Sequence, residues 1–190
     1  PTKTVLAKAT IGDSFPQNFC VYDLNQFLSV YSLYKDAELD FDEVNVVFKS
    51  GKNKIKYRKT PKTMIVTVPE KELSLPTVDV QFTFKDDDFS SVMKSASVLQ
   101  SPNVSIESDG EKIYVSCFSS TDDSAHTTMT EVSDGNGSKF KAVFNTENLK
   151  MIPGTYDVEI SSKGLAVFKS KDGSLTYWIA VESKYSKFGE

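Results

Sequence analysis

The sequence predicts an α+β protein in which one structural unit occurs twice, as antiparallel sheets with helices lining one face. Three observations support this fold class: an internal repeat, many short segments of alternating polarity, and a few amphipathic helical segments. The repeat is clearest where VVFKS at residues 46–50 returns 120 positions later as AVFKS at residues 166–170. The same spacing relates Ile55 to Leu175. Self-similarity at one offset indicates a tandem duplication.

A second repeated motif lies upstream, where VYD at residues 21–23 corresponds to VFN at residues 143–145. Each is followed by a short amphipathic segment and then by a strand-like segment. The second copy has a longer segment before residue 143 than the first copy has before residue 21, and the chain begins at Pro1. We therefore expect the first copy to lack its N-terminal strand–helix portion.

Strand-like segments dominate the chain. The stretch VDVQFTF at residues 78–84 alternates apolar and polar side chains, as a strand with one buried face does. Turn residues such as Asp109-Gly110 and Asp172-Gly173 separate several segments. We expect strands at residues 4–11, 18–22, 37–42, 44–50, 54–59, 63–68, 78–85, 103–108, 112–119, 125–132, 138–144, 156–161, 165–170 and 175–182.

Three segments have helical periodicity: residues 24–35, 89–99 and a short segment at 146–151. Three aspartates at residues 86–88 would cap the second helix and favour its first turn. The first helix places an apolar stripe, formed by Leu24, Phe27, Leu28 and Tyr31, on one face and Asn25, Ser29 and Ser32 on the other. The polar faces are small and rich in hydroxyl groups. Such a face is either ordinary solvated surface or one that passes closely by another molecule.

The domain organisation follows from the repeat and from a proline-bracketed segment. We expect a first domain at residues 1–68, an interdomain connector at residues 69–77, and a second domain at residues 78–190. Cys20 and Cys117 both lie in apolar strand patterns, which is typical of buried free thiols in a reducing cytosol.

The composition is that of a soluble globular protein, with 25% charged and 39% hydrophobic residues. No apolar run approaches the length of a membrane span. A net charge of −4 argues against nucleic-acid binding over the whole surface. It leaves room for a local basic lining, because electrostatic fields are set locally.

Nothing in the sequence indicates catalysis, a cofactor or a metal. His126 is the only histidine, and no nucleophile or acid is placed beside it by the pattern. The acidic clusters at residues 86–88 and 122–123 lack the alternating ligand spacing of a calcium loop. DGNG at residues 134–137 lies in a predicted hairpin and opens no helix, unlike a phosphate-binding loop. We therefore expect a protein without enzymatic activity.

Several motifs in order carry a family resemblance: residues 22–29, 88–100, 109–113, 145–158 and 177–182. In these segments the chain resembles the sliding clamp of T4-type bacteriophages, the processivity factor of the phage replicative DNA polymerase. The resemblance runs from about Lys3 to the C-terminus and lacks only the family's first strand, first helix and next strand or two. It implies a duplicated sliding-clamp (DNA clamp) fold, N-terminally truncated.

The resemblance also implies a function and partners. The full-length protein would be a homotrimeric ring that encircles duplex DNA without sequence preference, is loaded by an ATP-driven clamp loader, and tethers the polymerase in the cytoplasm of an infected bacterial host. A ring tethers topologically, so tight base contacts would hinder sliding. The alternative is a clamp-like, β-rich interaction or structural protein that binds no DNA. A nucleotide-using enzyme is a more distant alternative.

The DNA channel would be lined by helices with small polar faces and scattered lysines. The candidates are Lys94, Lys150, Lys35, Asn25 and Ser29. The family has a second basic residue one turn after Lys94, and here Ser97 stands at that position. Each lysine could instead be an ordinary solvated residue.

Two further surfaces follow from the resemblance. Head-to-tail ring closure would pair the strand at residues 63–68 with the one at 125–132, because exposed edges pair readily with other chains. The interface candidates are Met64, Ile65, Val66, Thr128 and Met129. A hydrophobic pocket near the connector would take C-terminal peptides of the polymerase and related proteins. Its candidates are Leu73, Leu75, Tyr185 and Phe188, which could alternatively pack the connector and tail onto the core.

Overall fold

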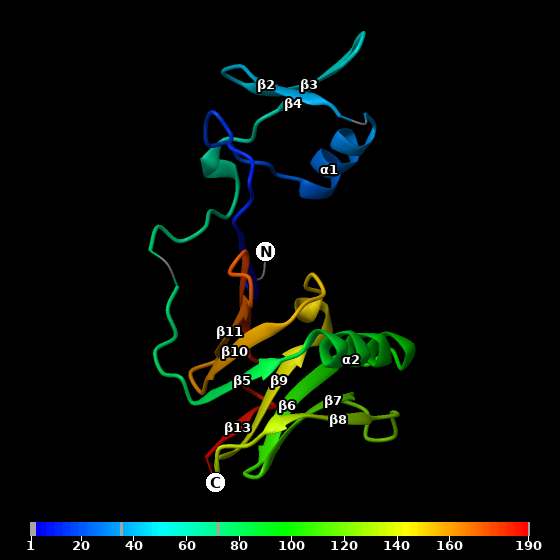
Figure 1. Cartoon of the computed structure of the whole chain (residues 1–190), viewed down its shortest axis with the longest axis vertical. Helices are drawn as coiled ribbons and strands as arrows, with labels where there is room; N and C mark the ends of the chain where they lie inside the picture. The colour runs from blue at the N-terminus through cyan, green and yellow to red at the C-terminus, as the bar shows by residue number, and fades with distance from the viewer. Residues whose placement is uncertain (1–2, 35, 72, 190) are drawn as a thin grey trace. The chain divides into compact units, whose positions relative to one another are not determined.

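The computed structural model describes residues 3–34, 36–71 and 73–189, which fall into two compact units (Figure 1). One unit comprises residues 11–70. The other comprises residues 71 onward together with the opening segment that ends at residue 10. Within the described residues, no helix has the length and apolar character needed to cross a membrane.

The second unit contains two five-stranded antiparallel sheets, in the orders β1-β12-β11-β10-β5 and β13-β9-β6-β7-β8. The strands of the first sheet are β1 (Val5–Ala9), β5 (Val80–Phe84), β10 (Tyr156–Ser161), β11 (Leu165–Ser170) and β12 (Leu175–Ala180). Those of the other are β6 (Asn103–Asp109), β7 (Lys112–Phe118), β8 (Thr128–Asp134), β9 (Lys139–Asn145) and β13 (Lys187–Phe188). The predicted alternation is confirmed, because inward-facing side chains of both sheets form one core.

The helix α2 (Asp86–Val98) covers part of this core by inserting Phe89, Val92 and Ala96. It contacts β7 and β8. It begins three residues before the predicted start, because Asp86 is already helical and the capping position is Lys85. The acidic residues therefore do not cap the helix through their side chains. They lie in its first turn, where carboxylates interact favourably with the helix dipole.

The first unit contains a three-stranded antiparallel sheet in the order β2-β3-β4. Its elements are α1 (Leu24–Ser32), β2 (Glu38–Phe41), β3 (Asn45–Ser50), β4 (Asn53–Arg58) and the 3-10 helix η1 (Lys62–Met64). Asp23 caps α1 by accepting a hydrogen bond from the Gln26 N–H at 2.9 Å. Phe27 packs against Phe48 and Tyr57, with ring centroids 5.3 Å and 5.2 Å away.

The apolar stripe of α1 is largely exposed. No residue of α1 is buried, and the side chains of Leu24 and Leu28 are 60% and 51% exposed. Phe27 alone reaches a half-buried position against the sheet. The periodicity identified the apolar face correctly, but the described residues of the unit supply too few neighbours to cover it.

The internal repeat is confirmed by equivalent elements. The middle strands β3 and β11 have the same burial pattern, with residues 46–48 and 166–168 buried. Each belongs to a run of three antiparallel strands that follows a helical segment. That segment is α1 before β2-β3-β4, and the 3-10 helix η2 (Thr146–Leu149) before β10-β11-β12.

Three predicted elements differ from the structure. Residues 63–68 form no strand but the end of η1 and an irregular segment, and residues 18–22 are also irregular. A strand needs a hydrogen-bonded neighbour, and neither segment pairs with a described strand. The short helix predicted at 146–151 is the 3-10 turn η2, which Asn145 caps by accepting from the Glu147 N–H at 2.9 Å.

Candidate functional site

The structure offers surfaces for contact rather than a reaction centre. His126 lies exposed in the loop between β7 and β8, not in the predicted strand. Among the described residues, no group of three or more histidine, cysteine, aspartate or glutamate side chains could hold a metal ion. Both cysteines are free: Cys117 is buried and Cys20 half-buried. Desolvation raises the pKa of the Cys117 thiol, which keeps it protonated and unreactive.

Lys94 lies on the exposed face of α2, as predicted, among small hydroxyl residues. Ser90, Ser91 and Ser97 are exposed with it. Asp87 lies on the same helical stripe, one turn before Ser91. Asp86 also lies on this face, where it accepts a hydrogen bond from the Ser90 hydroxyl at 3.2 Å. This face is therefore rich in hydroxyl groups, with one lysine against two carboxylates.

Lys150 follows η2 and is exposed, but its charge is partly offset. Its Nζ lies 2.8 Å from Glu147 Oε2 in an ion pair on the surface. In the first unit, Asn25 and Ser29 are exposed on α1, beside the exposed apolar stripe. Lys35 lies outside the described residues.

Two exposed strand edges stand out among the described residues. β8 is the last strand of its sheet, and the Met129 side chain on it is 64% exposed. Glu131 and Asp134 lie on the same outer face of β8 and both form ion pairs with Lys112, at 2.9 Å and 2.8 Å. These pairs raise the pKa of Lys112.

β4 is the other exposed edge, and it is strongly basic. Lys54, Lys56 and Arg58 alternate along it and are exposed. Ile55 and Tyr57 point to the opposite face, toward α1. The sequence analysis missed this stripe, although the KNKIKYRK pattern at residues 52–59 displays it.

The equivalent of β4 in the second unit already has a partner strand. The outer edge of β12 pairs with β1 in an antiparallel register, from Val5 opposite Ile179 to Ala9 opposite Leu175. Backbone hydrogen bonds extend the pairing beyond the ladder, with Ala180 N donating to Thr4 O at 2.8 Å. This pairing places the first strand of the chain in the sheet of the second unit.

The connector residues Leu73 and Leu75 come together in a groove of about 550 Å³ over β11 and β12. Val167 and Trp178 form part of its floor. The Trp178 indole N–H donates to the Leu73 carbonyl at 2.8 Å, which anchors the connector to the sheet. This hydrogen bond fixes the connector at Leu73 as one wall of the groove.

The other two pocket candidates lie elsewhere. Phe188 lines separate hollows, where its ring stacks on Phe140 with centroids 6.4 Å apart. Tyr185 lines neither these hollows nor the connector groove, and a hydrogen bond with Ser120 lowers the pKa of its hydroxyl. The four predicted residues therefore do not form one pocket in this structure.

Comparisons with known proteins agree on one family. The sequence profile described as gp45 sliding clamp, C terminal, matches residues 81–183. The sliding clamp of Vibrio phage KVP40 is 32% identical over 185 residues, covering 94% of this chain and 82% of that protein.

Solved structures share the fold at lower identity. The β subunit of the DNA polymerase of Streptococcus pyogenes has a TM-score of 0.69 at 15% identity, over 95% of this chain and 52% of that one. The chain thus spans about half of that protein. A PCNA of A. fulgidus, solved with the C-terminal region of FEN-1 bound, has a TM-score of 0.58 at 15% identity, over 84% of this chain and 70% of that one. These likenesses confirm the predicted clamp fold.

Proposed function

This chain belongs to the gp45 sliding-clamp family, and from that premise we propose that it acts as a DNA polymerase processivity factor in an infected bacterial cell. It closes with further copies into a homotrimeric ring around duplex DNA and carries the polymerase along it. The observation that carries this proposal is the pairing of β1 with β12, because it provides a template for joining one copy to the next.

The template follows from the internal repeat. β8 begins at Thr128, 123 residues after the start of β1 at Val5, which is close to the 120-residue offset of the repeat. β9, which lies between β8 and η2, corresponds to the irregular residues 18–22 before α1. β1 is thus the counterpart of β8, and β4 the counterpart of β12. Since β1 pairs with the outer edge of β12, we expect β8 of one copy to pair with the outer edge of β4 in the next. Such a heterologous contact closes a ring when the rotation permits.

Charge favours this pairing over contact between like edges. The outer face of β4 presents Lys54, Lys56 and Arg58. That of β8 presents Glu131 and Asp134, which share Lys112 as their ion-pair partner and leave this face with a net negative charge. Opposite charges across an interface steer association and disfavour the wrong partner. Two β4 edges would repel each other.

The predicted interface residues fit beside this ladder. Thr128 and Met129 lie on β8 itself. Met64, Ile65 and Val66 follow β4 closely, and the side chains of Met64 and Val66 are exposed. In our proposal they add apolar contacts next to the paired strands rather than forming a strand of their own.

The helical faces line the channel in this proposal. Asn25 and Ser29 on α1, Lys94 on α2 and Lys150 after η2 meet the DNA backbone across a layer of water. A hydroxyl-rich surface with few cations favours sliding, because few phosphate contacts leave little salt-dependent affinity to hold the ring in one place. We include Lys35 in this set from its sequence position.

The groove under Leu73 and Leu75 receives a C-terminal segment of the polymerase or of the clamp loader. Its support is a floor in which Val167 and Trp178 lie beside the Lys169–Glu159 ion pair, and a connector anchored to Trp178 with apolar groups at the edge of the groove. The A. fulgidus PCNA with the FEN-1 C-terminal region bound shows that a relative in fold accepts such a segment.

Product length on primed circular DNA, with polymerase and loader supplied, tests the proposal. Adding this chain should lengthen the products, and linear templates with open ends should lose the effect as the ring slides off. A clamp-like protein that binds no DNA would leave product length unchanged on both templates.

A further inference from the structure

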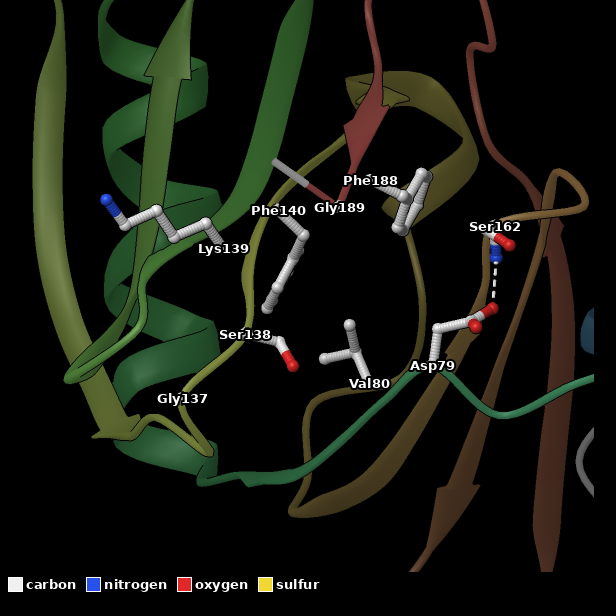
Figure 2. Close-up of a pocket in the computed structure, with 9 residues that line it drawn as sticks. All are labelled: Asp79, Val80, Gly137, Ser138, Lys139, Phe140, Ser162, Phe188 and Gly189. Carbon is white, nitrogen blue, oxygen red and sulfur yellow. Dashed lines mark hydrogen bonds between the residues drawn. The ribbon is translucent and has the colours of Figure 1, made fainter.

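One end of the second unit contains an apolar groove that the proposed function does not use. Figure 2 shows Phe140 and Phe188 facing the start of β5, with Val80 between them and Asp79. Hollows of about 560 Å³ and about 570 Å³ lie against the two rings, which stack with an interplanar angle of 10°. The aromatic ring of the C-terminal tail therefore occupies only part of a larger groove.

The tail, residues 182–189, covers the outer edge of β9 irregularly. Only β13 pairs with β9 as a strand, over two residues. At Val143 the backbone N–H donates to the Ser186 hydroxyl at 2.9 Å instead of to a strand carbonyl. The Val143 carbonyl accepts from the Glu182 N–H at 2.7 Å. A longer extended segment could pair with this edge more completely.

Like charges face each other where the tail pairs with β9. Lys187 lies directly opposite Lys141 in the strand pair, and Lys139 is two residues along β9. Like charges opposite each other destabilise a strand pair. Lys141 has an anionic partner, Glu107 at 3.0 Å, whereas Lys139 and Lys187 have no ion pair within the described residues.

The acidic group of the groove is already engaged. Asp79 accepts hydrogen bonds from the Ser162 N–H at 2.7 Å, seen in Figure 2, and from the Thr77 hydroxyl at 2.9 Å. These hydrogen bonds lower the pKa of Asp79. Its charge is thus held on the far wall. On the β9 side, Glu107 and Asp109 lie opposite Lys141 and Lys139, so Lys187 of the tail is the cation in excess there.

We propose that the tail is a displaceable strap, and that the edge of β9 binds an extended, acidic segment of a partner protein that carries an aromatic residue. The incoming ring takes the place of Phe188 on Phe140. An aspartate or glutamate takes the place of Lys187 opposite Lys141, which replaces repulsion with attraction. Main-chain hydrogen bonds along β9 supply the rest of the affinity, as in other strand-addition sites.

The test uses the whole chain and a fluorescein-labelled decapeptide in which aspartate alternates with phenylalanine and valine. Fluorescence anisotropy should detect binding, and a peptide with lysine in place of aspartate should not bind. Lys187→Glu should weaken binding about fivefold, because the new carboxylate pairs with Lys141 and holds the strap in place. Lys184→Glu, the same charge change in the same tail, should alter binding by less than about twofold.

Two further measurements test whether the tail and the peptide compete for the edge of β9. Amide hydrogen exchange at Val143 should slow in Lys187→Glu without any peptide present. A chain ending at Tyr185 should bind the peptide more tightly, because its competitor is gone. Equal weakening by Lys184→Glu and Lys187→Glu, or equal binding of the lysine peptide, would overturn the proposal. A single-stranded oligonucleotide that binds while the peptide does not would also overturn it. None of these results depends on ring formation or on polymerase.

Discussion

Reversing the charge of Lys94 is the sharpest perturbation of the proposed DNA channel. Lys94 is exposed on α2, so Lys94→Glu should change the free energy of unfolding by less than about 0.5 kcal/mol. A unit charge about 4 Å from a phosphate in water contributes about 1 kcal/mol, which corresponds to about fivefold in an equilibrium constant. Reversal replaces this attraction with a repulsion of similar size, reduced where water separates the groups.

Lys150 provides a second test site. Its Nζ lies 2.8 Å from Glu147, so the substitution Lys150→Glu would leave two carboxylates side by side. Because both reversals change the local charge by the same amount, Lys150→Glu should reduce DNA contact about as much as Lys94→Glu, and the double variant should show the largest loss. Lys163→Glu, an exposed lysine in the turn between β10 and β11, is the matched control for the change in net charge.

The assay is product length on a primed circular template with loader and polymerase supplied. Products should be shorter with either single variant than with the control, and shortest with the double variant. The differences should grow at about 0.01 M salt, where the Debye length is about 30 Å, and shrink at about 0.1 M, where it is about 10 Å. Unchanged product lengths at low salt would show that these lysines are ordinary solvated residues, and the channel assignment would have to be withdrawn.

Two other predictions concern the connector groove and the repeated core. Trp178 is the only tryptophan, so binding of a polymerase C-terminal peptide under the connector should change its fluorescence. Leu75→Glu should weaken that binding at least about tenfold. An unshifted emission spectrum at saturating peptide would place the docking site elsewhere. Phe168 is fully buried, so Phe168→Ala should cost about 3–5 kcal/mol in urea unfolding, and a cost below about 1 kcal/mol would contradict the assigned core.

The second unit was largely predictable because its strands carry dense local signals. Residues 78–84 alternate cleanly, and both sheet faces they imply are present in β5 and its neighbours. The repeat at residues 46–50 and 166–170 also identified matching middle strands. In each case, the pattern of side chains alone determined which face was buried.

Long-range pairing was not predictable in the same way. β1 precedes the first unit in the sequence, yet it joins the sheet of the second. This pairing could not be predicted, because nothing in the five residues of β1 specifies the distant edge of β12. Residues 63–68 look like a strand but lack a neighbour to pair with. Phe188 looked like part of the connector pocket, but the tail carries it to β9 instead.

In the proposed ring β4 of one copy pairs with β8 of the next, and sedimentation equilibrium tests this junction directly. Lys54→Glu with Lys56→Glu on β4, or Glu131→Lys with Asp134→Lys on β8, should each weaken self-association at least about tenfold. One chain carrying all four substitutions should recover most of the association, because a head-to-tail ring then regains opposite charges at every junction. Thermal unfolding midpoints would confirm that each variant is folded. If the four-substitution chain associates as weakly as either pair alone, or if the β8 substitutions have no effect, the proposed junction is wrong.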